Sequence, residues 1–200
     1  MAYLILVRHG ESEWNKQGLW TGLHDSLLSE KGKEEAKQAA KKLEHIPIDL
    51  AYTSILSRAK ETCNILLKTL DKNVSITQAK ALNERDYGDF TGKNKWQIQQ
   101  LVGEEQFLKI RRSWDFPIPN GESLKQVYER VFPYFETEIL PKLQIGKNIL
   151  ICAHGNSLRS LIKYLENVSD AEIPTVEIKT GQIYLYTIDQ NGNVTSKEIR

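Results

Sequence analysis

Apolar residues in this chain gather in short runs, separated by longer segments in which apolar positions recur every three or four residues. The runs at 4–7 and 149–153 are apolar throughout and too short for helices, which is typical of parallel strands buried on both faces. Weaker runs predict four more strands, at 49–53, 74–77, 182–188 and 193–199. The last two strands are expected to meet at the turn Asn191-Gly192.

The segments with helical period predict a helix after most of the strands. Ser29 can cap the first helix, Thr53 or Ser54 the second, and Ser123 a later one, where Gln126 would complete a capping box. The predicted helices span 30–45, 55–70, 96–114, 123–135, 156–166 and, as a short helix, 169–173. Pro133 is expected to kink the fourth of them.

The alternation of strands and helices predicts an α/β fold with three layers, in which helices flank a mostly parallel central sheet. A chain of 200 residues is long enough for one well-buried core, so residues 1–200 are expected to form a single domain.

Composition and charge limit the kinds of binding partner and the cellular location that we expect for the protein. The net charge is +1 and no basic run appears, which argues against nucleic acid and membrane surfaces as partners. No apolar run is long enough for a signal peptide or a membrane span, so we expect a cytoplasmic protein. Cys63 and Cys152 are expected to be structural thiols, and no Cys/His spacing indicates a metal site.

The two strongest apolar runs each end in a histidine followed by a glycine. His9 follows Arg8 at the end of the first run, and His154 precedes Gly155 and Asn156 at the end of the second. Ligands of open α/β sheets collect outside the carboxyl ends of the strands. Because the chain has only four histidines, the placement of two of them at such ends predicts a site there.

Imidazole acts as a nucleophile at neutral pH in phosphoryl transfer through a phosphohistidine, and His9 is the candidate. Arg8 can hold phosphate oxygens and keep the neighbouring imidazole uncharged. A lone histidine at a strand end is more often a polar residue without a catalytic role. The second histidine at a strand end makes the catalytic interpretation the better one. His154 and Arg58 can stabilise the charge of the transferred group.

The polar segment 82–95 has no period and contains Glu84, the best candidate for a general acid or base. A surface carboxylate is an equally good interpretation of Glu84. Lys95, Arg111 and Arg112 either form a solvated helix face or clamp a carboxylate and a second phosphate. In such a clamp, each hydrogen bond to a charged group would contribute roughly 1.5–3 kcal/mol to the free energy of binding.

With these residues the sequence resembles those of the histidine phosphatase superfamily and, within it, those of the 2,3-bisphosphoglycerate-dependent phosphoglycerate mutases. The resemblance rests on an ordered set of motifs that extends over nearly the whole chain. The motifs are the stretch from Leu6 to Asn15, Thr21-Gly22, the stretch from Ala51 to Ala59, Leu82-Asn83-Glu84-Arg85 with Tyr87-Gly88, Asn94-Lys95, Arg111-Arg112, the turn from Asn120 to Ser123, and the stretch from Ala153 to Arg159.

The resemblance implies a phosphoglycerate mutase-like fold and the interconversion of 3-phosphoglycerate and 2-phosphoglycerate. His9 would carry the phosphoryl group, Glu84 would give and take the proton, and 2,3-bisphosphoglycerate would be the primer, with no metal. Six residues would cradle the transferred group: Arg8, Asn15, Arg58, His154, Gly155 and Asn156. Six would hold the rest of the substrate: Thr21, Gly22, Tyr87, Lys95, Arg111 and Arg112. The resemblance also allows for a homodimer.

The chain departs from the longer members of the family in two places, both associated with covering the site. It passes from Trp114 to Asn120 almost directly, and its tail after the last strand is short. A shorter cover makes hydrolysis of the phosphohistidine possible, so a phosphomonoester hydrolase of the same superfamily is the alternative. It does not remove the residues that clamp the substrate, and shorter mutases are consistent with the family. A non-catalytic anion-binding module is a third interpretation, with little support because every residue that the chemistry needs is present.

Overall fold

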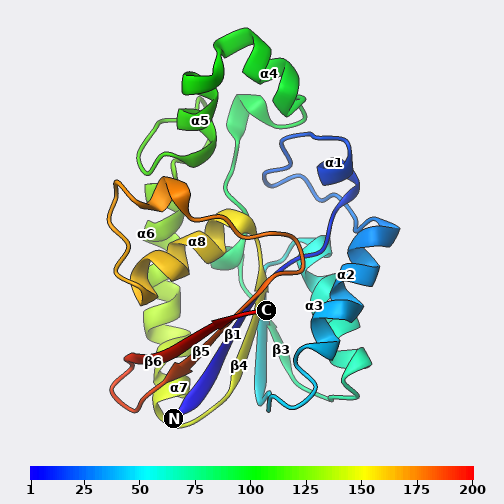
Figure 1. The fold of residues 1–200 in the computed structure, drawn as a ribbon, viewed down its shortest axis with the longest axis vertical. Helices are drawn as coiled ribbons and strands as arrows, with labels where there is room; N and C mark the ends of the chain where they lie inside the picture. The colour runs from blue at the N-terminus through cyan, green and yellow to red at the C-terminus, as the bar shows by residue number, and fades with distance from the viewer.

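The computed structural model describes residues 1–200 and contains a six-stranded sheet with helices on both faces (Figure 1). The strands are β1 (Ala2–Arg8), β2 (Leu50–Thr53), β3 (Ile76–Gln78), β4 (Ile149–Ala153), β5 (Ile183–Ile188) and β6 (Val194–Ile199). They lie in the order β3-β2-β4-β1-β5-β6. Strands β1, β2, β3 and β4 pair in parallel, whereas β5 pairs antiparallel with both of its neighbours, β1 and β6. This topology confirms the predicted mostly parallel sheet.

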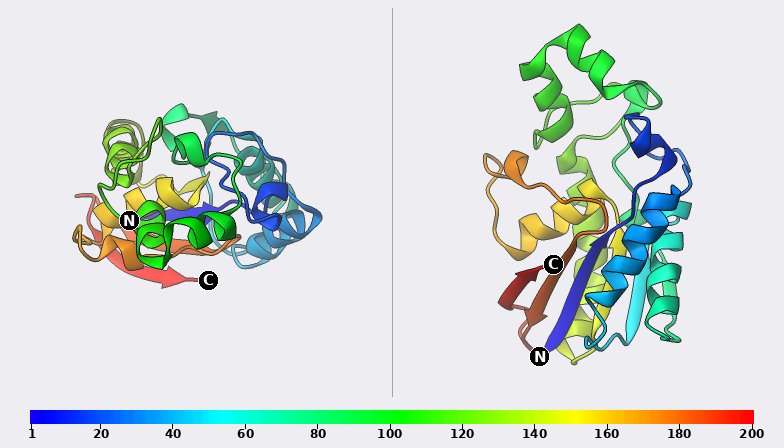
Figure 2. Two further views of the ribbon diagram at one scale, coloured as in Figure 1. Left: turned by 90° about the horizontal axis from the view of Figure 1, so that it is seen from above. Right: turned by 45° about the vertical axis from the view of Figure 1, so that its right-hand side comes forward.

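Helices pack on the two faces of the sheet and beyond one end of it. They are α1 (Glu13–Lys16), α2 (Glu30–Lys41), α3 (Ser57–Thr69), α4 (Lys95–Val102), α5 (Glu104–Arg112), α6 (Leu124–Tyr134), α7 (Leu140–Gln144) and α8 (Gly155–Leu165), with 3-10 turns at Lys80–Leu82, Gly88–Phe90 and Ile173–Thr175. Helices α2 and α3 cover one face, and α6, α7 and α8 the other (Figure 2). Helices α4 and α5 stand above the carboxyl ends of the strands (Figure 1).

The central strand β1 explains why its apolar run has no polar position. Leu4 and Leu6 belong to the core under α6 and α8, whereas Ile5 and Val7 belong to the core under α2 and α3. All four side chains are fully buried. Since successive side chains of a strand point to opposite faces, a strand covered on both sides must be apolar at every position.

Two of the predicted helix caps are confirmed. The Ser29 hydroxyl accepts a hydrogen bond from Gly32 N at 3.1 Å. Ser123 and Gln126 form the predicted capping box at the start of α6. Past Pro133 the helix continues into a π-helical turn at Phe135–Ile139, which disturbs its regular hydrogen bonding near the proline.

The predicted start of the second helix is wrong. Helix α3 begins at Ser57, its N-cap is Leu56, and neither Thr53 nor Ser54 caps it. The Ser54 hydroxyl instead lies 2.7 Å from a ring nitrogen of His154. A residue that looks like a local cap therefore serves a contact 100 positions away in the chain, which no local pattern can indicate.

The single helix predicted over 96–114 is also wrong. Gly103 adopts a φ of 80° and divides the segment into α4 and α5, because that left-handed conformation cannot continue a right-handed helix. A third apolar cluster then holds the two helices over the sheet end: Trp20, Tyr87, Ile98, Phe107, Ile110 and Ile118.

Smaller differences concern helix ends and the segment near 170. Helix α2 ends at Lys41 and turns follow as far as His45, while α8 begins at Gly155, with His154 as its N-cap. Instead of the short helix at 169–173, a 3-10 turn occupies Ile173–Thr175.

Both cysteines are buried and free, one on α3 and one on β4, as expected of structural thiols. None of the helices combines the length and the apolar character needed to cross a membrane.

Candidate active site

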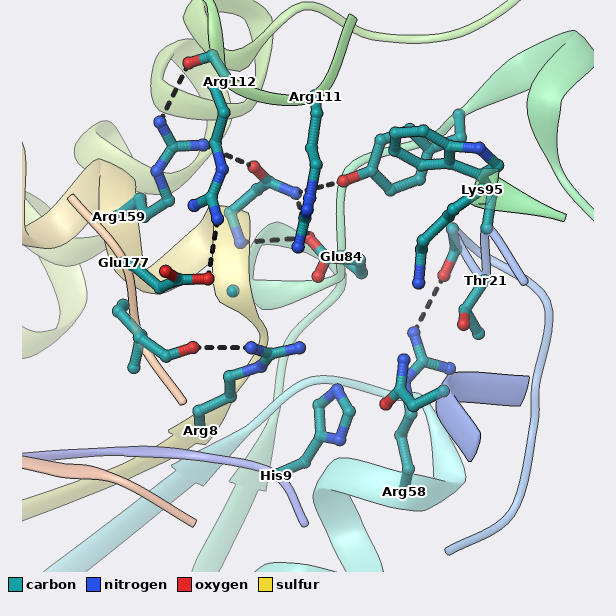
Figure 3. Close-up of a pocket in the computed structure, with 17 residues that line it drawn as sticks. Arg8, His9, Thr21, Arg58, Glu84, Lys95, Arg111, Arg112, Arg159 and Glu177 are labelled. Carbon is teal, nitrogen blue, oxygen red and sulfur yellow. Dashed lines mark hydrogen bonds and ion pairs between the residues drawn. The ribbon is translucent and has the colours of Figure 1, made fainter. Parts of the chain in front are cut away.

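A polar pocket opens at the carboxyl ends of β1 and β4, beneath α4 and α5 (Figure 3). Seventeen residues line it, and only three of them are hydrophobic. Thirteen of the fourteen predicted site residues are among them: Arg8, His9, Asn15, Thr21, Gly22, Arg58, Glu84, Tyr87, Lys95, Arg111, Arg112, Gly155 and Asn156. The fourteenth, His154, lies fully buried behind His9.

His9 stands at the floor of the pocket, directly after β1 (Figure 3). Its backbone N–H donates to Ala153 O at 3.0 Å, which ties it to the end of β4. Its Nδ1 lies 2.6 Å from Gly10 O, and because a carbonyl oxygen only accepts, Nδ1 carries the proton and Nε2 the lone pair. Burial, together with the charges of Arg58 and Arg8, holds the pKa of His9 well below its ordinary value. The imidazole is therefore neutral, with Nε2 available as a nucleophile.

Gly10 follows His9 because no side chain fits at that position. A Cβ added to Gly10 would lie 2.1 Å from Gly32 O, at the start of α2. The backbone N–H of Gly10 donates to the Thr62 hydroxyl on α3 at 3.1 Å. Helices α2 and α3 thus fix the backbone next to His9, and this close approach keeps its imidazole in place.

His154 is held by a serine from the neighbouring strand end. Its Nε2 lies 2.7 Å from Ser54 Oγ, and its ring centroid is 4.9 Å from that of His9. Ser54 Oγ also accepts a hydrogen bond from Leu56 N at 3.2 Å, which fixes the serine side chain. Burial and the charge of Arg58 hold the pKa of His154 well below its ordinary value. The ring is therefore neutral, and its Nδ1 is a buried atom without a partner in the protein.

Two arginines frame the floor, of which Arg58 is buried and Arg8 is partly buried. Both terminal nitrogens of Arg58 donate to backbone carbonyls of the loop after β1, at Gly22 and His24, each at 2.8 Å. Arg8 donates to Ile178 O from the segment before β5. Burial lowers the pKa of Arg8, and it lowers the pKa of Arg58 to about 10. The Nε atom of each is buried without a partner, which leaves N–H donors for an anion.

Glu84 is 7% exposed, so the surface interpretation is excluded. Its Oε1 accepts three hydrogen bonds, from Arg85 N at 2.7 Å, Asn156 N at 3.2 Å and Asn156 Nδ2 at 3.0 Å. Its Oε2 lies 3.7 Å from the position that a Cβ of Gly155 would occupy. One carboxylate oxygen therefore anchors the side chain and the other is left to exchange a proton in the pocket.

Three cations come from the two helices above the sheet. Lys95 is the first residue of α4, and Arg111 and Arg112 are the last two of α5. Burial, and then the charge of Arg111, lowers the pKa of Lys95 to about 8. Burial also lowers the pKa of Arg111. Since all three line the pocket, the interpretation of this set as a solvated helix face is wrong.

Sequence reasoning missed four lining residues: Trp20, Arg159, Glu177 and Ile178. Arg159 donates to Asn156 Oδ1 at 3.0 Å and to Arg112 O at 2.9 Å, and so connects the partner of Glu84 to the end of α5. The spacing between Asn156 and Arg159, three residues on one helix, is a signal that could have revealed it. Glu177 lies in a loop without any such signal.

The pocket is strongly cationic although the chain as a whole is nearly neutral. Six of its residues are lysine or arginine and two are glutamate. No group of three or more His, Cys, Asp and Glu side chains is placed to hold a metal ion. The arrangement can bind a ligand with several anionic groups and present one of them to a neutral imidazole.

Comparison with known families and sequences agrees with this chemistry. The family described as the histidine phosphatase superfamily (branch 1) matches residues 4–198. The 2,3-bisphosphoglycerate-dependent phosphoglycerate mutase of Parvibaculum lavamentivorans is 50% identical in an alignment of 199 positions that covers 98% of this chain and 95% of that one. The phosphoglycerate mutase of Schizosaccharomyces pombe is 45% identical over 98% of this chain and 94% of its own.

Solved structures share the fold. The α-ribazole phosphatase of Shigella flexneri has a TM-score of 0.81 at 27% identity and covers 99% of this chain and 94% of its own. The protein YhfR of Bacillus stearothermophilus has a TM-score of 0.84 at 26% identity, with 97% and 94% covered.

Proposed function

This chain belongs to the histidine phosphatase superfamily, and from that membership we propose that it is a 2,3-bisphosphoglycerate-dependent phosphoglycerate mutase. The reaction is the interconversion of 3-phosphoglycerate and 2-phosphoglycerate, a step of glycolysis and gluconeogenesis. The observation that carries the proposal is that relatives 44–50% identical over nearly the whole chain bear this name. A glycolytic role also implies a cytoplasmic protein with small-molecule partners.

The pocket fits a ligand with two phosphates and a carboxylate. Buried nitrogen atoms without partners, on Arg8, Arg58 and His154, surround His9 at one end. Lys95, Arg111 and Arg112 supply positive charge at the other. 2,3-Bisphosphoglycerate, when bound, supplies the phosphoryl group that primes the enzyme.

In the proposed mechanism His9 Nε2 attacks phosphorus, and the bond from phosphorus to the substrate oxygen breaks. Glu84 gives its proton to that oxygen, which leaves as the hydroxyl of a monophosphoglycerate. In the return step Glu84 takes the proton of whichever hydroxyl attacks the phosphohistidine. Attack by the 2-hydroxyl of 3-phosphoglycerate gives 2,3-bisphosphoglycerate and frees His9. The bisphosphate then turns in the pocket and transfers its 3-phosphoryl group to His9, so that 2-phosphoglycerate leaves, and the same steps in reverse convert 2-phosphoglycerate to 3-phosphoglycerate.

The remaining pocket residues position the groups that do not react. Arg8, Arg58, His154 and the residues Asn15, Gly155 and Asn156 would hold the transferred phosphoryl group, whose charge lies on its equatorial oxygens. Thr21, Gly22, Tyr87, Lys95, Arg111 and Arg112 would hold the carboxylate and the second phosphate. Arg8 and Arg58 also keep His9 neutral between turnovers.

A phosphomonoester hydrolase is the alternative, because a structural neighbour is a phosphatase. Hydrolysis needs the floor of the pocket but not the cations of α4 and α5. The short cover does not by itself favour it, since the match spans 95% of the P. lavamentivorans mutase, which leaves little room for an additional segment in that protein.

A coupled assay on purified protein with trace 2,3-bisphosphoglycerate tests the proposal. We expect interconversion of the two monophosphoglycerates well above the rate of phosphate release. Phosphate release from many unrelated esters, without interconversion, would identify a hydrolase. Acid-labile phosphate on the protein after incubation with 2,3-bisphosphoglycerate would eliminate the binding-module interpretation. The homodimer stays a prediction, and light scattering tests it.

A further inference from the structure

The segment from Val176 to Ile178 runs along the pocket and engages two of its arginines (Figure 3). Glu177 Oε1 lies 2.7 Å from Arg112 Nη2, and Val176 O accepts from Arg112 Nη1 at 3.5 Å. Ile178 O accepts from Arg8 Nη1. The chain therefore presents its own anion and carbonyl oxygens to groups that the proposed reaction assigns to the substrate.

Glu177 differs from the other carboxylate of the pocket. Glu84 is buried and held by three N–H donors, whereas the carboxylate of Glu177 bonds only to Arg112 and its side chain is 58% exposed. The contact with Arg112, reinforced by the charges of Arg111 and Arg8, lowers the pKa of Glu177, so it is anionic at neutral pH. An exposed anion with one partner can move away when another anion arrives.

We propose that Glu177 is a specificity-determining residue, an internal anion that occupies Arg112 until a carboxylate or phosphate of the substrate displaces it. This role rests on the proposed mutase function. The side chain remains next to the pocket after displacement, where its charge repels the ligand. Because Coulomb repulsion grows with the charge of the ligand, Glu177 weakens the binding of the bisphosphate more than that of a monophosphate.

Such discrimination suits a mutase. The enzyme must bind 2,3-bisphosphoglycerate tightly enough to be primed, and yet loosely enough for the bound bisphosphate to turn before the second transfer. A nearby negative charge reduces the affinity for the more highly charged species selectively. The pair of Glu177 and Arg112 also prevents an unpaired guanidinium from facing the pocket between turnovers.

If the salt bridge between Glu177 and Arg112 had only a structural role, removal of Glu177 would change substrate affinity in the opposite direction. If Glu177 only orients Arg112, its removal should weaken the binding of all substrates. If Glu177 competes with the substrate, its removal should strengthen binding. The variants Glu177→Gln, which keeps the shape and a hydrogen-bonding oxygen, and Glu177→Ala, which removes both, separate the two cases.

The test is calorimetric titration of 3-phosphoglycerate and of 2,3-bisphosphoglycerate, in a His9→Ala background that prevents phosphoryl transfer. For Glu177→Gln we expect Kd for 3-phosphoglycerate to fall about 3- to 10-fold, the effect of removing one partly exposed charge. The fall should be larger for the bisphosphate. The matched control is Glu198→Gln, which removes one charge from a surface pair with Arg200 outside the pocket and should change neither Kd.

A second measurement does not depend on the His9 variant. With His9 present, Glu177→Gln should lower KM for 3-phosphoglycerate by a similar factor. Unchanged or increased Kd and KM in both Glu177 variants would overturn the role of Glu177 and leave the mutase proposal intact. Failure of the mutase proposal would appear differently, as the absence of interconversion by the wild-type protein.

Discussion

The floor and the rim of the pocket are built in different ways. We define the floor as Arg8, His9, Arg58 and His154, and the rim as Lys95, Arg111, Arg112 and Glu177. His9 and His154 directly follow two adjacent parallel strands, and both are at most 2% exposed. The rim lies on α4, α5 and the loop before β5, and in its pair of Arg112 and Glu177 the side chains are 19% and 58% exposed.

This difference separates two tasks. In the proposed mechanism the floor carries the chemistry that a mutase and a hydrolase share, and this chemistry needs atoms fixed to within fractions of an ångström. The rim would select the molecule that gives or receives the phosphoryl group, and it would have to let that molecule enter, turn and leave. Substitutions in the floor should therefore reduce kcat for every substrate, whereas substitutions in the rim should change KM and the ratio of mutase to phosphatase activity.

The largest effect is expected for His9→Ala. Loss of the nucleophile should reduce both mutase and phosphatase turnover by at least about 10³-fold. Acid-labile phosphate on the protein should disappear with it. The control is His45→Ala, which removes an exposed histidine after α2. Acid-labile phosphate that still forms on the His9→Ala protein would show that another residue carries it.

Glu84→Gln should come next, with a fall in kcat of about 10²–10⁴-fold, typical of a lost general acid. The amide oxygen can still accept from Arg85 N and Asn156, so the geometry is kept and KM should change little. An ester with an acidic leaving group, such as p-nitrophenyl phosphate, needs no proton to depart and should phosphorylate His9 with a much smaller loss. Equal losses for both esters would contradict the assignment of Glu84 as the acid.

Arg111→Ala tests the rim. Loss of one charged hydrogen-bond donor, at roughly 1.5–3 kcal/mol, should raise KM for 3-phosphoglycerate by about 10- to 100-fold. Hydrolysis of a simple monoester without a carboxylate should be nearly unchanged. Lys109→Ala removes a half-exposed cation from the same helix and serves as the control. A comparable loss with both substrates would abolish the distinction between floor and rim.

The smallest effect concerns the pH dependence of binding through Lys95. The pKa of its ammonium is about 8, so the ammonium is charged below that pH and loses its proton above it. The substrate phosphate is already a dianion there, and the affinity for 3-phosphoglycerate should fall, by at most tenfold per pH unit, as the pH rises through about 8. Lys95→Arg keeps its charge and should show a flat profile in calorimetric titrations between pH 7 and about 9. A falling profile in both proteins would assign the titration to another group.

Local sequence patterns were sufficient for the sheet and for the placement of His9 and His154 at one edge of it. A fully apolar run can be satisfied only between two covering layers, and parallel strands bring their carboxyl ends to one edge, so the two histidines had to lie near each other. The ordered motifs then indicated thirteen of the residues that line the pocket. What these patterns left open for Glu84 was its burial, since a carboxylate in an aperiodic segment is equally suited to the surface and to a site.

Contacts between distant segments were decided only by the tertiary structure. Helix α5 packs against Trp20 in the third apolar cluster, a contact between segments far apart in the chain, and no helical period contains that information. Ser54 resembles a helix cap until the fold brings His154 to it, and Glu177 is one loop acid among several until Arg112 lies 2.7 Å away. The strands and the caps at Ser29 and Ser123 follow from interactions between neighbours in the chain, and the sequence by itself determined these. The floor inherits its position from the strands, whereas the rim depends on packing between segments far apart in the sequence, so its assembly became visible only in three dimensions.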